Sequence, residues 1–259
     1  MFKSVLALVI AAHFISDFLF QTSQMAEQKC LRDKAGWLAM GGHIAIILVF
    51  NLAAFYLLLN SWCAMFGAMA VTVTHFGIDG IKSFLKNKKY FTLTFVLDQV
   101  LHIILIVGIV YFVTNHIAQT SYGYYEFIKQ VLYLPDWNVT CDNVVWTISI
   151  GVGCVWGGAC LIRSILCDLK LDTKSGNEKE VHSGKWIGIL ERISILILIP
   201  LNQWAAVGLL LTAKSIARHS KMDDKQYAEY YLIGTLLSFI AAVVCGVLIA
   251  GIWNVKTTT

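Results

Sequence analysis

The sequence predicts an all-α integral membrane protein, built as a polytopic bundle of six to seven transmembrane helices. Of its 259 residues, 58% are hydrophobic and only 14% are charged, whereas soluble domains carry about 25% charged residues. The chain has two prolines, which leaves little room for loop-rich modules, and a modest formal net charge of +4. Such a charge is not typical of nucleic-acid binding. We therefore expect membrane lipid as a partner and no nucleic acid.

A helix that crosses a bilayer needs ~20 mostly apolar residues, and six stretches satisfy this requirement. They are Phe2–Phe20, Trp37–Leu59, Trp62–Leu85, Phe95–Thr114, Val144–Cys167 and Tyr230–Trp253. The first stretch lacks a clean signal-peptide cleavage site and contains polar residues, so we interpret it as a retained span. No linker separates soluble domains. We expect residues 1–259 to form one membrane domain, with a four-helix half (1–114) and a C-terminal helical half (144–253).

The segment Trp186–Thr212 is also apolar, but Pro200, Asn202 and Gln203 lie near its middle. Proline removes a helix hydrogen bond, and exposed polar groups are costly in lipid. The segment is therefore either a kinked seventh span or a broken, re-entrant hairpin.

Basic loops indicate how the spans are oriented. The loops 21–36, 86–94 and 168–185 are rich in lysine and arginine, and the loops between them are poorer. By the positive-inside rule these three loops are cytoplasmic and the N-terminus lies outside. The basic loop 214–226 then lies inside only if Trp186–Thr212 is re-entrant, which favours that alternative.

Histidine and aspartate residues recur at one depth in the first four spans. They are the pairs His13 and Asp17, His75 and Asp79, and Asp98 and His102, together with the single His43. Each pair is spaced i, i+4, so both side chains lie on one face of their helix. Because helix directions alternate, the acidic ends of the pairs and His43 lie within roughly 10 Å of the same membrane surface. A charged group in hydrocarbon costs at least ~2.5 kcal/mol, so this cluster requires an explanation.

A metal centre is the interpretation that this pattern favours. Imidazole and carboxylate groups are the usual protein ligands of zinc, manganese and iron. The predicted ligands of a divalent metal, zinc or manganese, are His13, Asp17, His43, His75, Asp79, Asp98 and His102. Seven ligands suit two ions better than one, and two ions can activate water for attack at phosphorus. Two alternatives stay open: a proton or cation relay, and hydrogen bonds that only hold the helices together.

Further charged residues are candidates for catalysis and for substrate binding. The predicted catalytic residues are Lys82, Glu191 and Arg192, and the predicted substrate-binding residues are Lys82, Arg192, Lys214 and Arg218. Lys82 lies three residues after Asp79 and can extend to the headgroup region. Arg192 can bind a phosphate through two parallel hydrogen bonds, and Glu191 can transfer a proton. A purely structural Glu–Arg pair at a helix end is the alternative.

Six blocks of the sequence, in order, resemble a known family. They are "HFISDFLFQ" (13–21), "THFGIDGIK" (74–82), "LDQVLH" (97–102), "IGILER" (187–192), "AKSIAR" (213–218) and "EYYLIGTLLS" (229–238). Together they resemble the bacterial membrane proteins catalogued as domain of unknown function 3307, over nearly the whole chain. This resemblance implies a bacterial inner membrane and no particular activity. "THFGID" is also similar to the His-x-x-x-Asp block of membrane-bound metal-dependent hydrolases, which implies metal binding by His75 and Asp79. The chain differs from that group in its C-terminal half.

The sequence therefore favours an intramembrane metal-dependent hydrolase that acts on a lipid or lipid-linked phosphate ester at the cytoplasmic face. A proton- or cation-coupled transporter that uses the same cluster as a relay is the second hypothesis. A non-catalytic membrane partner or sensor with a structural metal is the third. A soluble protein partner that docks on the basic loops, or a homo-oligomer, is compatible with each.

Overall fold

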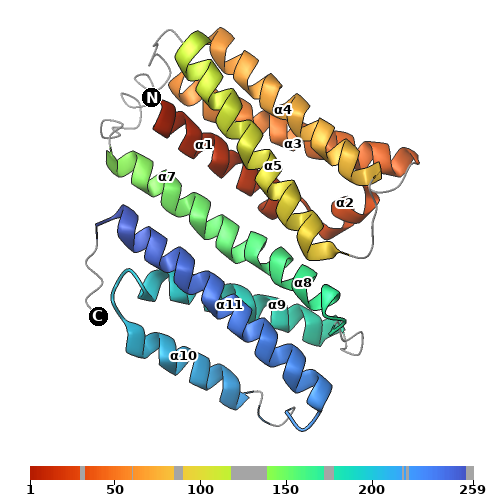
Figure 1. Cartoon of the computed structure of the whole chain (residues 1–259), viewed down its shortest axis with the longest axis vertical. Coiled ribbons are helices and arrows are strands. Elements are labelled where there is room, and N and C mark those ends of the chain that lie inside the picture. The colour runs from red at the N-terminus through yellow and green to blue at the C-terminus, as the bar shows by residue number, and fades with distance from the viewer. Residues whose placement is uncertain are drawn as a thin grey trace. The chain divides into compact units, whose positions relative to one another are not determined.

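The protein is helical throughout the part of the chain that the structure, a computed structural model, describes (Figure 1). The described residues are 1–29, 33–59, 61–84, 90–117, 139–171, 178–217, 219 and 222–254. Six helical stretches in them are long and apolar enough to cross a membrane: Phe2–Leu19, Lys34–Leu58, Trp62–Lys82, Phe91–Ile117, Cys141–Asp168 and Lys225–Ile252. They correspond to the six predicted spans. The all-α fold class is confirmed, and the chain is an integral membrane protein.

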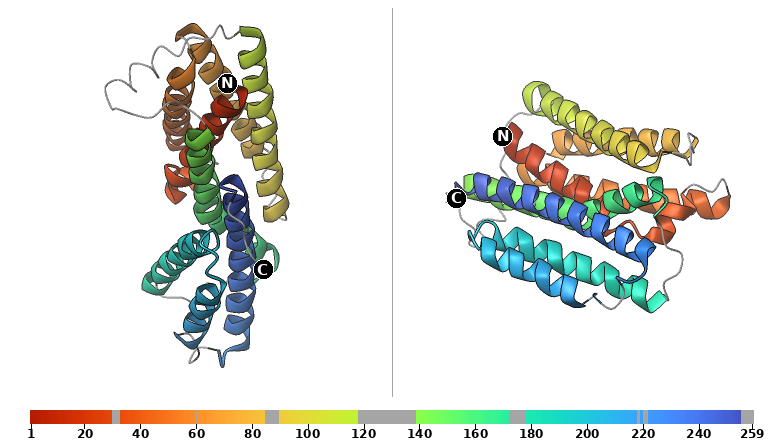
Figure 2. Two further views of the ribbon diagram at one scale, coloured as in Figure 1. Left: turned by 90° about the vertical axis from the view of Figure 1, so that its left-hand side faces the viewer. Right: turned by 60° about the horizontal axis from the view of Figure 1, so that its bottom comes forward.

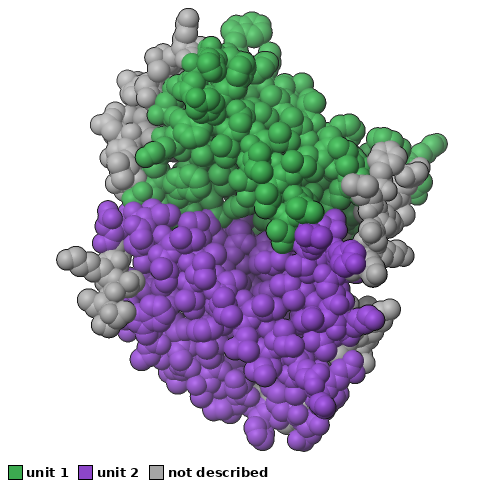
Figure 3. Space-filling model, in the orientation of Figure 1, with its two compact units in different colours: residues 1–87, 96–149 green, residues 88–95, 150–259 purple. Residues whose placement is uncertain are grey.

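The helices divide into two compact units, which Figure 3 shows in different colours. Unit 1 comprises residues 1–87 and 96–149, and unit 2 comprises residues 88–95 and 150–259. The four predicted spans that carry the His/Asp cluster all lie largely in unit 1. The segment Trp186–Thr212 and the last span lie in unit 2.

Unit 1 is built mainly from four long helices and one short helix. Its elements are α1 (Phe2–Phe14) with the π-helix η1 (Ile15–Leu19), α2 (Ser23–Gln28), α3 (Lys34–Leu58), α4 (Ser61–Phe84), α5 (Phe91–Phe112) with the π-helix η2 (Val113–Ile117), and most of α7 (Val139–Val152). Helix α3 packs against α1, α2 and α4. A Cβ atom at Gly67 of α4 would lie 2.7 Å from the ring of the buried Phe55 of α3. Glycine is therefore required for this close approach of α3 and α4.

The short helix α2 returns the chain toward α3. Its first turn is capped by Thr22, whose hydroxyl oxygen accepts a hydrogen bond from the amide of Met25 at 3.1 Å. Helix α3 begins in the same way, because a carboxylate oxygen of Asp33 accepts from the amide of Gly36 at 2.8 Å. Such caps satisfy amide groups that have no partner within the helix. They fix the position of Lys29, which directly follows α2.

Unit 2 contains the remaining helices. They are the π-helix η3 (Gly153–Gly157), α8 (Gly158–Asp168), α9 (Glu178–Leu198), α10 (Trp204–Ala217) and α11 (Lys225–Ile252). Helix α9 packs against α10, α11 and η3, and α11 also packs against α8. The core of the unit includes Ile195, Ile199 and Ala242, whose side chains are fully buried. Figure 2 shows these helices from two further directions.

The segment Trp186–Thr212 is broken, which was one of the two alternatives that the sequence left open. Helix α9 ends at Leu198 and α10 begins at Trp204. Between them Asn202 has a φ of 59°, a conformation that asparagine tolerates better than most residues. Helices α9 and α10 then run side by side in opposite directions (Figures 1 and 2). A straight seventh span is therefore not formed, and the re-entrant placement in the membrane stays a prediction.

Candidate metal centre

The structure brings all seven predicted metal ligands together in unit 1. They come from α1 and η1 (His13 and Asp17), α3 (His43), α4 (His75 and Asp79) and α5 (Asp98 and His102). None of the seven side chains is more than 8% exposed. The cluster therefore lies inside the helix packing, although its residues are up to 89 positions apart in the sequence.

His75 is the centre of this cluster. The centroid of its ring lies 4.0 Å from that of His102, 5.4 Å from that of His43 and 5.5 Å from that of His13. His43, which has no acidic residue four positions away, is fully buried beside it. Each histidine thus contacts a neighbour from a different helix, and the i, i+4 pairs are joined into one group.

Two imidazole nitrogens and two carboxylate oxygens lie next to one another in the cluster. The Nε2 atom of His43 lies 3.4 Å from Oδ1 of Asp17 and 3.5 Å from Oδ2 of Asp79. The Nε2 atom of His75 lies 3.3 Å and 3.8 Å from the same two oxygens. Around a tetrahedral zinc ion with bonds of 2.0–2.1 Å, neighbouring ligand atoms are ~3.3–3.4 Å apart. The nitrogen–oxygen distances of this four-atom set are therefore close to those around one such ion.

The remaining three predicted ligands border this set. Asp98 and His102 offer atoms that lie within 4.8 Å of each other and of an atom of Asp79. His13 groups in the same way with Asp17 and His75. His75, Asp79 and Asp17 thus connect the four-atom set to the rest of the cluster.

Several nitrogen and oxygen atoms of the cluster that could bind a metal have no hydrogen-bond partner among the described residues. They are Nε2 of His13, His43, His75 and His102, Nδ1 of His43, and Oδ1 of Asp17 and Asp98, all of them buried. Buried polar atoms in native proteins are nearly always hydrogen-bonded. The Nε2 atoms of His43 and His75 lie 3.4 Å and 3.3 Å from Oδ1 of Asp17, so these atoms can pair with one another or bind a shared ligand.

His102 is oriented as metal-binding histidines are. Its Nδ1 atom lies 2.8 Å from the backbone carbonyl oxygen of Asp98. A carbonyl oxygen can only accept, so Nδ1 carries the proton and Nε2 keeps its lone pair. Proteins commonly use such a hydrogen bond to fix the tautomer of a metal ligand.

A change of helix type positions Asp17. At Ile15 the helix α1 becomes the π-helix η1, in which the amide of Phe20 donates to the carbonyl of Ile15 at 3.1 Å. The hydroxyl of Ser16 donates to the carbonyl of His13 at 2.9 Å. Short π-helical turns are rare and occur frequently at functional sites. Nothing in the sequence pattern predicted this turn.

Two lysines neutralise carboxylates of the cluster. The ammonium nitrogen of Lys29 lies 2.7 Å from Oδ2 of Asp79, and that of Lys82 lies 2.6 Å from Oδ2 of Asp98. Lys82 was predicted as a substrate-binding residue, and it is 41% exposed. Lys29 was not predicted, because the sequence places it in a basic loop, and only the return of the chain through α2 brings it to the cluster.

Gln21 is a second residue that sequence analysis missed. With its amide oxygen directed toward Lys29, it accepts a hydrogen bond from the ammonium group at 2.7 Å. Its amide nitrogen then donates to the backbone carbonyl of Asp17 at 3.1 Å. Its position at the end of the block "HFISDFLFQ", which also contains His13 and Asp17, could have indicated that Gln21 lies near the cluster.

The predicted site residues of the C-terminal half lie in unit 2, where they contact one another. Lys214 of α10 donates to the buried carboxylate of Glu191 in α9. The buried Arg192 donates from Nε to the carbonyl of Val155 in η3 at 3.1 Å, and from Nη1 to the hydroxyl of Ser238 in α11 at 3.0 Å. These contacts join four elements of the unit. Their predicted catalytic and binding roles stay predictions.

Arg218, the fourth predicted substrate-binding residue, lies outside the described residues.

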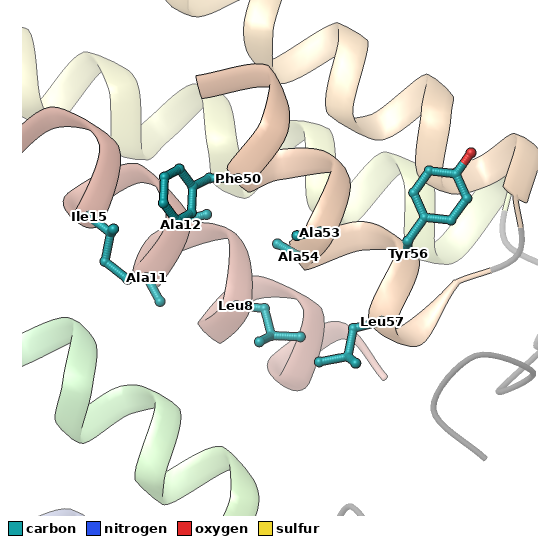
Figure 4. Close-up of a pocket in the computed structure, with 9 residues that line it drawn as sticks. All are labelled: Leu8, Ala11, Ala12, Ile15, Phe50, Ala53, Ala54, Tyr56 and Leu57. Atoms are coloured by element: carbon teal, nitrogen blue, oxygen red, sulfur yellow. The ribbon is translucent and has the colours of Figure 1, made fainter. Parts of the chain in front are cut away.

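An apolar groove lies between α1 and α3 (Figure 4). Its volume is ≈ 730 Å³, and it is lined by Leu8, Ala11, Ala12, Ile15, Phe50, Ala53, Ala54, Tyr56 and Leu57. Ala12 and Ile15 lie within two positions of His13 in the sequence, so one end of the groove lies within a helical turn of that residue. The lining is almost entirely apolar.

Comparison with known proteins finds a family match. Residues 5–130 match the model of a family described as "Protein of unknown function (DUF3307)", and this part of the chain is similar to that family. The match includes all seven clustered residues and both lysines, and it confirms the resemblance noted in the sequence. The resembling blocks from Ile187 onward lie beyond it. No curated protein and no solved structure matches the chain. The likeness to metal-dependent hydrolases therefore rests on "THFGID" alone.

Proposed function

We propose that this protein is an intramembrane metal-dependent hydrolase that acts on a lipid or lipid-linked phosphate ester. One observation carries the proposal: two imidazole nitrogens, of His43 and His75, each lie 3.3–3.8 Å from one carboxylate oxygen of Asp17 and one of Asp79, in a buried site. Imidazole nitrogens and carboxylate oxygens suit zinc or manganese.

The proposed chemistry follows from the donor set. A divalent ion bound there would polarise a phosphoryl oxygen and supply a nucleophilic water at neutral pH. Asp17 and Asp79 would offset the charge of the ion, and His43 and His75 would fix its position. His102, whose Nδ1 is held by the carbonyl of Asp98, keeps Nε2 available as a further ligand or as a general base.

The choice of a lipid substrate rests on where the cluster lies. Its residues belong to helical stretches that are long and apolar enough to cross a membrane, which favours a substrate that is itself held in the membrane. The groove between α1 and α3 offers apolar surface for an acyl chain beside His13. The positive charge of the loops supports a cytoplasmic position for this end of the helices, in what the family resemblance implies is a bacterial inner membrane.

Metal analysis by mass spectrometry on the detergent-purified protein tests the proposal. His75→Ala is compared with His116→Ala, which replaces an exposed histidine in η2 outside the cluster. We expect zinc or manganese to bind to wild type and His116→Ala but not to His75→Ala. Phosphate release from lipid phosphate esters in mixed micelles should follow the metal. Wild-type protein without stoichiometric metal after supplementation would refute the proposal.

A second candidate, the cation- or proton-coupled transporter, is favoured by the two ion pairs. Lys29–Asp79 and Lys82–Asp98 lie beside buried histidines, and chains of such groups within membranes often conduct protons. Proton flux into proteoliposomes that persists after metal removal and is lost in Asp98→Asn would support this function instead.

A further inference from the structure

We propose that Lys29 and Lys82 form an oxyanion-binding subsite, so that the cluster holds a single metal ion and the substrate phosphoryl group beside it. This inference rests on the proposed function, and it replaces the two-metal arrangement that seven ligands suggest. It also assigns a binding role to Lys29, which is only 10% exposed.

The two ammonium groups pair with two neighbouring carboxylates of the cluster. Lys29 contacts Oδ2 of Asp79 and Lys82 contacts Oδ2 of Asp98. Asp79 and Asp98 in turn offer ligand atoms within 4.8 Å of each other and of His102. The first ion already shares Oδ2 of Asp79 with Lys29. A second metal held by Asp79, Asp98 and His102 would have to compete with Lys82 at Asp98, and with both Lys29 and the first ion at Asp79.

The charges of the cluster favour one ion over two. The described cluster contains three carboxylates (Asp17, Asp79 and Asp98) and two ammonium groups. With neutral histidines, one divalent cation leaves an excess of one positive charge, and a second cation raises this excess to three. Uncompensated charge is costly inside a protein. The single-metal cluster needs only an anion to become neutral.

The lysines have hydrogen-bond donors to offer to such an anion. Each ammonium group has three N–H donors. The contacts described for Lys29 use one donor on Asp79 and one on Gln21, and the contact described for Lys82 uses one on Asp98. Phosphate oxygens can accept the donors that are left. Because Lys82 is 41% exposed, the anion can approach from its side.

The chemical class of ligand is therefore a phosphate group next to the bound metal. Inorganic phosphate, or orthovanadate as its analogue, is the simplest probe, and short-chain phosphatidic acid presents the same group on a lipid. Tighter binding of phosphatidic acid than of phosphate would assign the subsite to a lipid headgroup. Equal binding would assign it to phosphate itself.

The experiment combines metal stoichiometry with phosphate affinity measured by titration calorimetry on the zinc-loaded, detergent-purified protein. The variants are Lys29→Gln, Lys82→Gln and Lys82→Arg, and the control is Lys185→Gln, an exposed lysine of α9 in unit 2. Gel filtration confirms that each variant is folded.

We expect one equivalent of metal in wild type. Phosphate affinity should fall at least ~10-fold in Lys29→Gln and Lys82→Gln, since charge-assisted hydrogen bonds are strong, and Lys82→Arg should restore part of it. Lys185→Gln should bind as wild type does. Two equivalents of metal in wild type, or unchanged phosphate affinity in both glutamine variants, would overturn this inference and leave the hydrolase proposal standing. Absence of metal from wild type would instead overturn the hydrolase proposal.

Discussion

The two units of the molecule both bury charged residues, and they satisfy them differently. In unit 2, Glu191 pairs with Lys214, and Arg192 donates to a backbone carbonyl and to Ser238. In unit 1, the lysines satisfy only part of the carboxylates, and the Nε2 atoms of four histidines have no hydrogen-bond partner among the described residues. The network of unit 2 is thus largely complete by itself, whereas the cluster of unit 1 leaves several buried nitrogen and oxygen atoms without a hydrogen-bond partner among the described residues.

The comparison separates polar groups with good partners from polar groups with poor ones. Leaving a buried donor or acceptor unpaired costs ~1–3 kcal/mol, and several buried atoms of the unit 1 cluster have only long contacts with their neighbours. In unit 2 the corresponding cost is small, because among the described polar atoms of its Glu191–Arg192–Lys214 network only Oε1 of Glu191 lacks a partner. A metal ion would offset the cost in unit 1 and would add little in unit 2.

The largest effect is expected from His75→Ala, which tests the comparison at the centre of unit 1. Its ring contacts those of His13, His43 and His102. Metal binding should be abolished, and phosphate-ester hydrolysis should fall by more than ~100-fold, since changes that only disturb the orientation of ligands already cost 10–100-fold. Mass spectrometry and a phosphate-release assay measure the two effects. Retention of full metal content in the variant would contradict the assignment of His75.

Glu191→Gln is the matching change in unit 2. It leaves the ammonium group of Lys214, which is only 17% exposed, without its carboxylate partner. Breaking a buried ion pair in this way costs ~3–5 kcal/mol, and partial exposure should place the effect at the lower end. We expect a lower midpoint of thermal unfolding in detergent with unchanged metal content. Loss of metal in this variant would show that the two networks are not independent.

Removal of metal should destabilise the wild type and leave His75→Ala unaffected. A ligand present at 100 times its dissociation constant stabilises the folded state by ~2.7 kcal/mol. A chelator should therefore lower the unfolding midpoint of wild type and of Glu191→Gln by similar amounts. A chelator effect that persists in His75→Ala would place the metal elsewhere in the protein.

The sequence predicted those features of the site that depend on local spacing. The pairs His75 and Asp79, and Asp98 and His102, are spaced i, i+4 within single α-helices, so periodicity alone places the members of each pair next to each other. The break in α9–α10 followed from Pro200 and Asn202. Both predictions use properties of residues within one segment, where chain geometry leaves few alternatives.

Contacts between distant segments could not be predicted from the sequence. Lys29 contacts Asp79, fifty positions away, because α2 folds back on α3. Nothing in the sequence around a loop lysine predicts this contact. The partners of Arg192 are a carbonyl in η3 and a hydroxyl in α11, neither of which is visible as a motif. A predicted phosphate ligand and a structural cross-link have the same appearance in a sequence.

The smallest effect is expected from Gln21→Ala. This change tests a residue that contacts the cluster without being one of the seven predicted ligands. Gln21 contacts Lys29 and the backbone of Asp17. None of the described contacts makes it a member of the four-atom set formed by His43, His75, Asp17 and Asp79. The variant should bind one metal ion with affinity lowered by ~10-fold or less, since groups that only orient ligands act at the lower end of the 10–100-fold range. Phosphate affinity should fall more than metal affinity, because Lys29 loses a neighbour that fixes its ammonium group. Competitive titration with a zinc-binding dye and calorimetry with phosphate measure the two quantities.

A larger loss of metal affinity than of phosphate affinity would contradict this expectation. It would mean that Gln21 acts mainly by holding the backbone of Asp17, and that phosphate binding does not depend on the contact between Gln21 and Lys29.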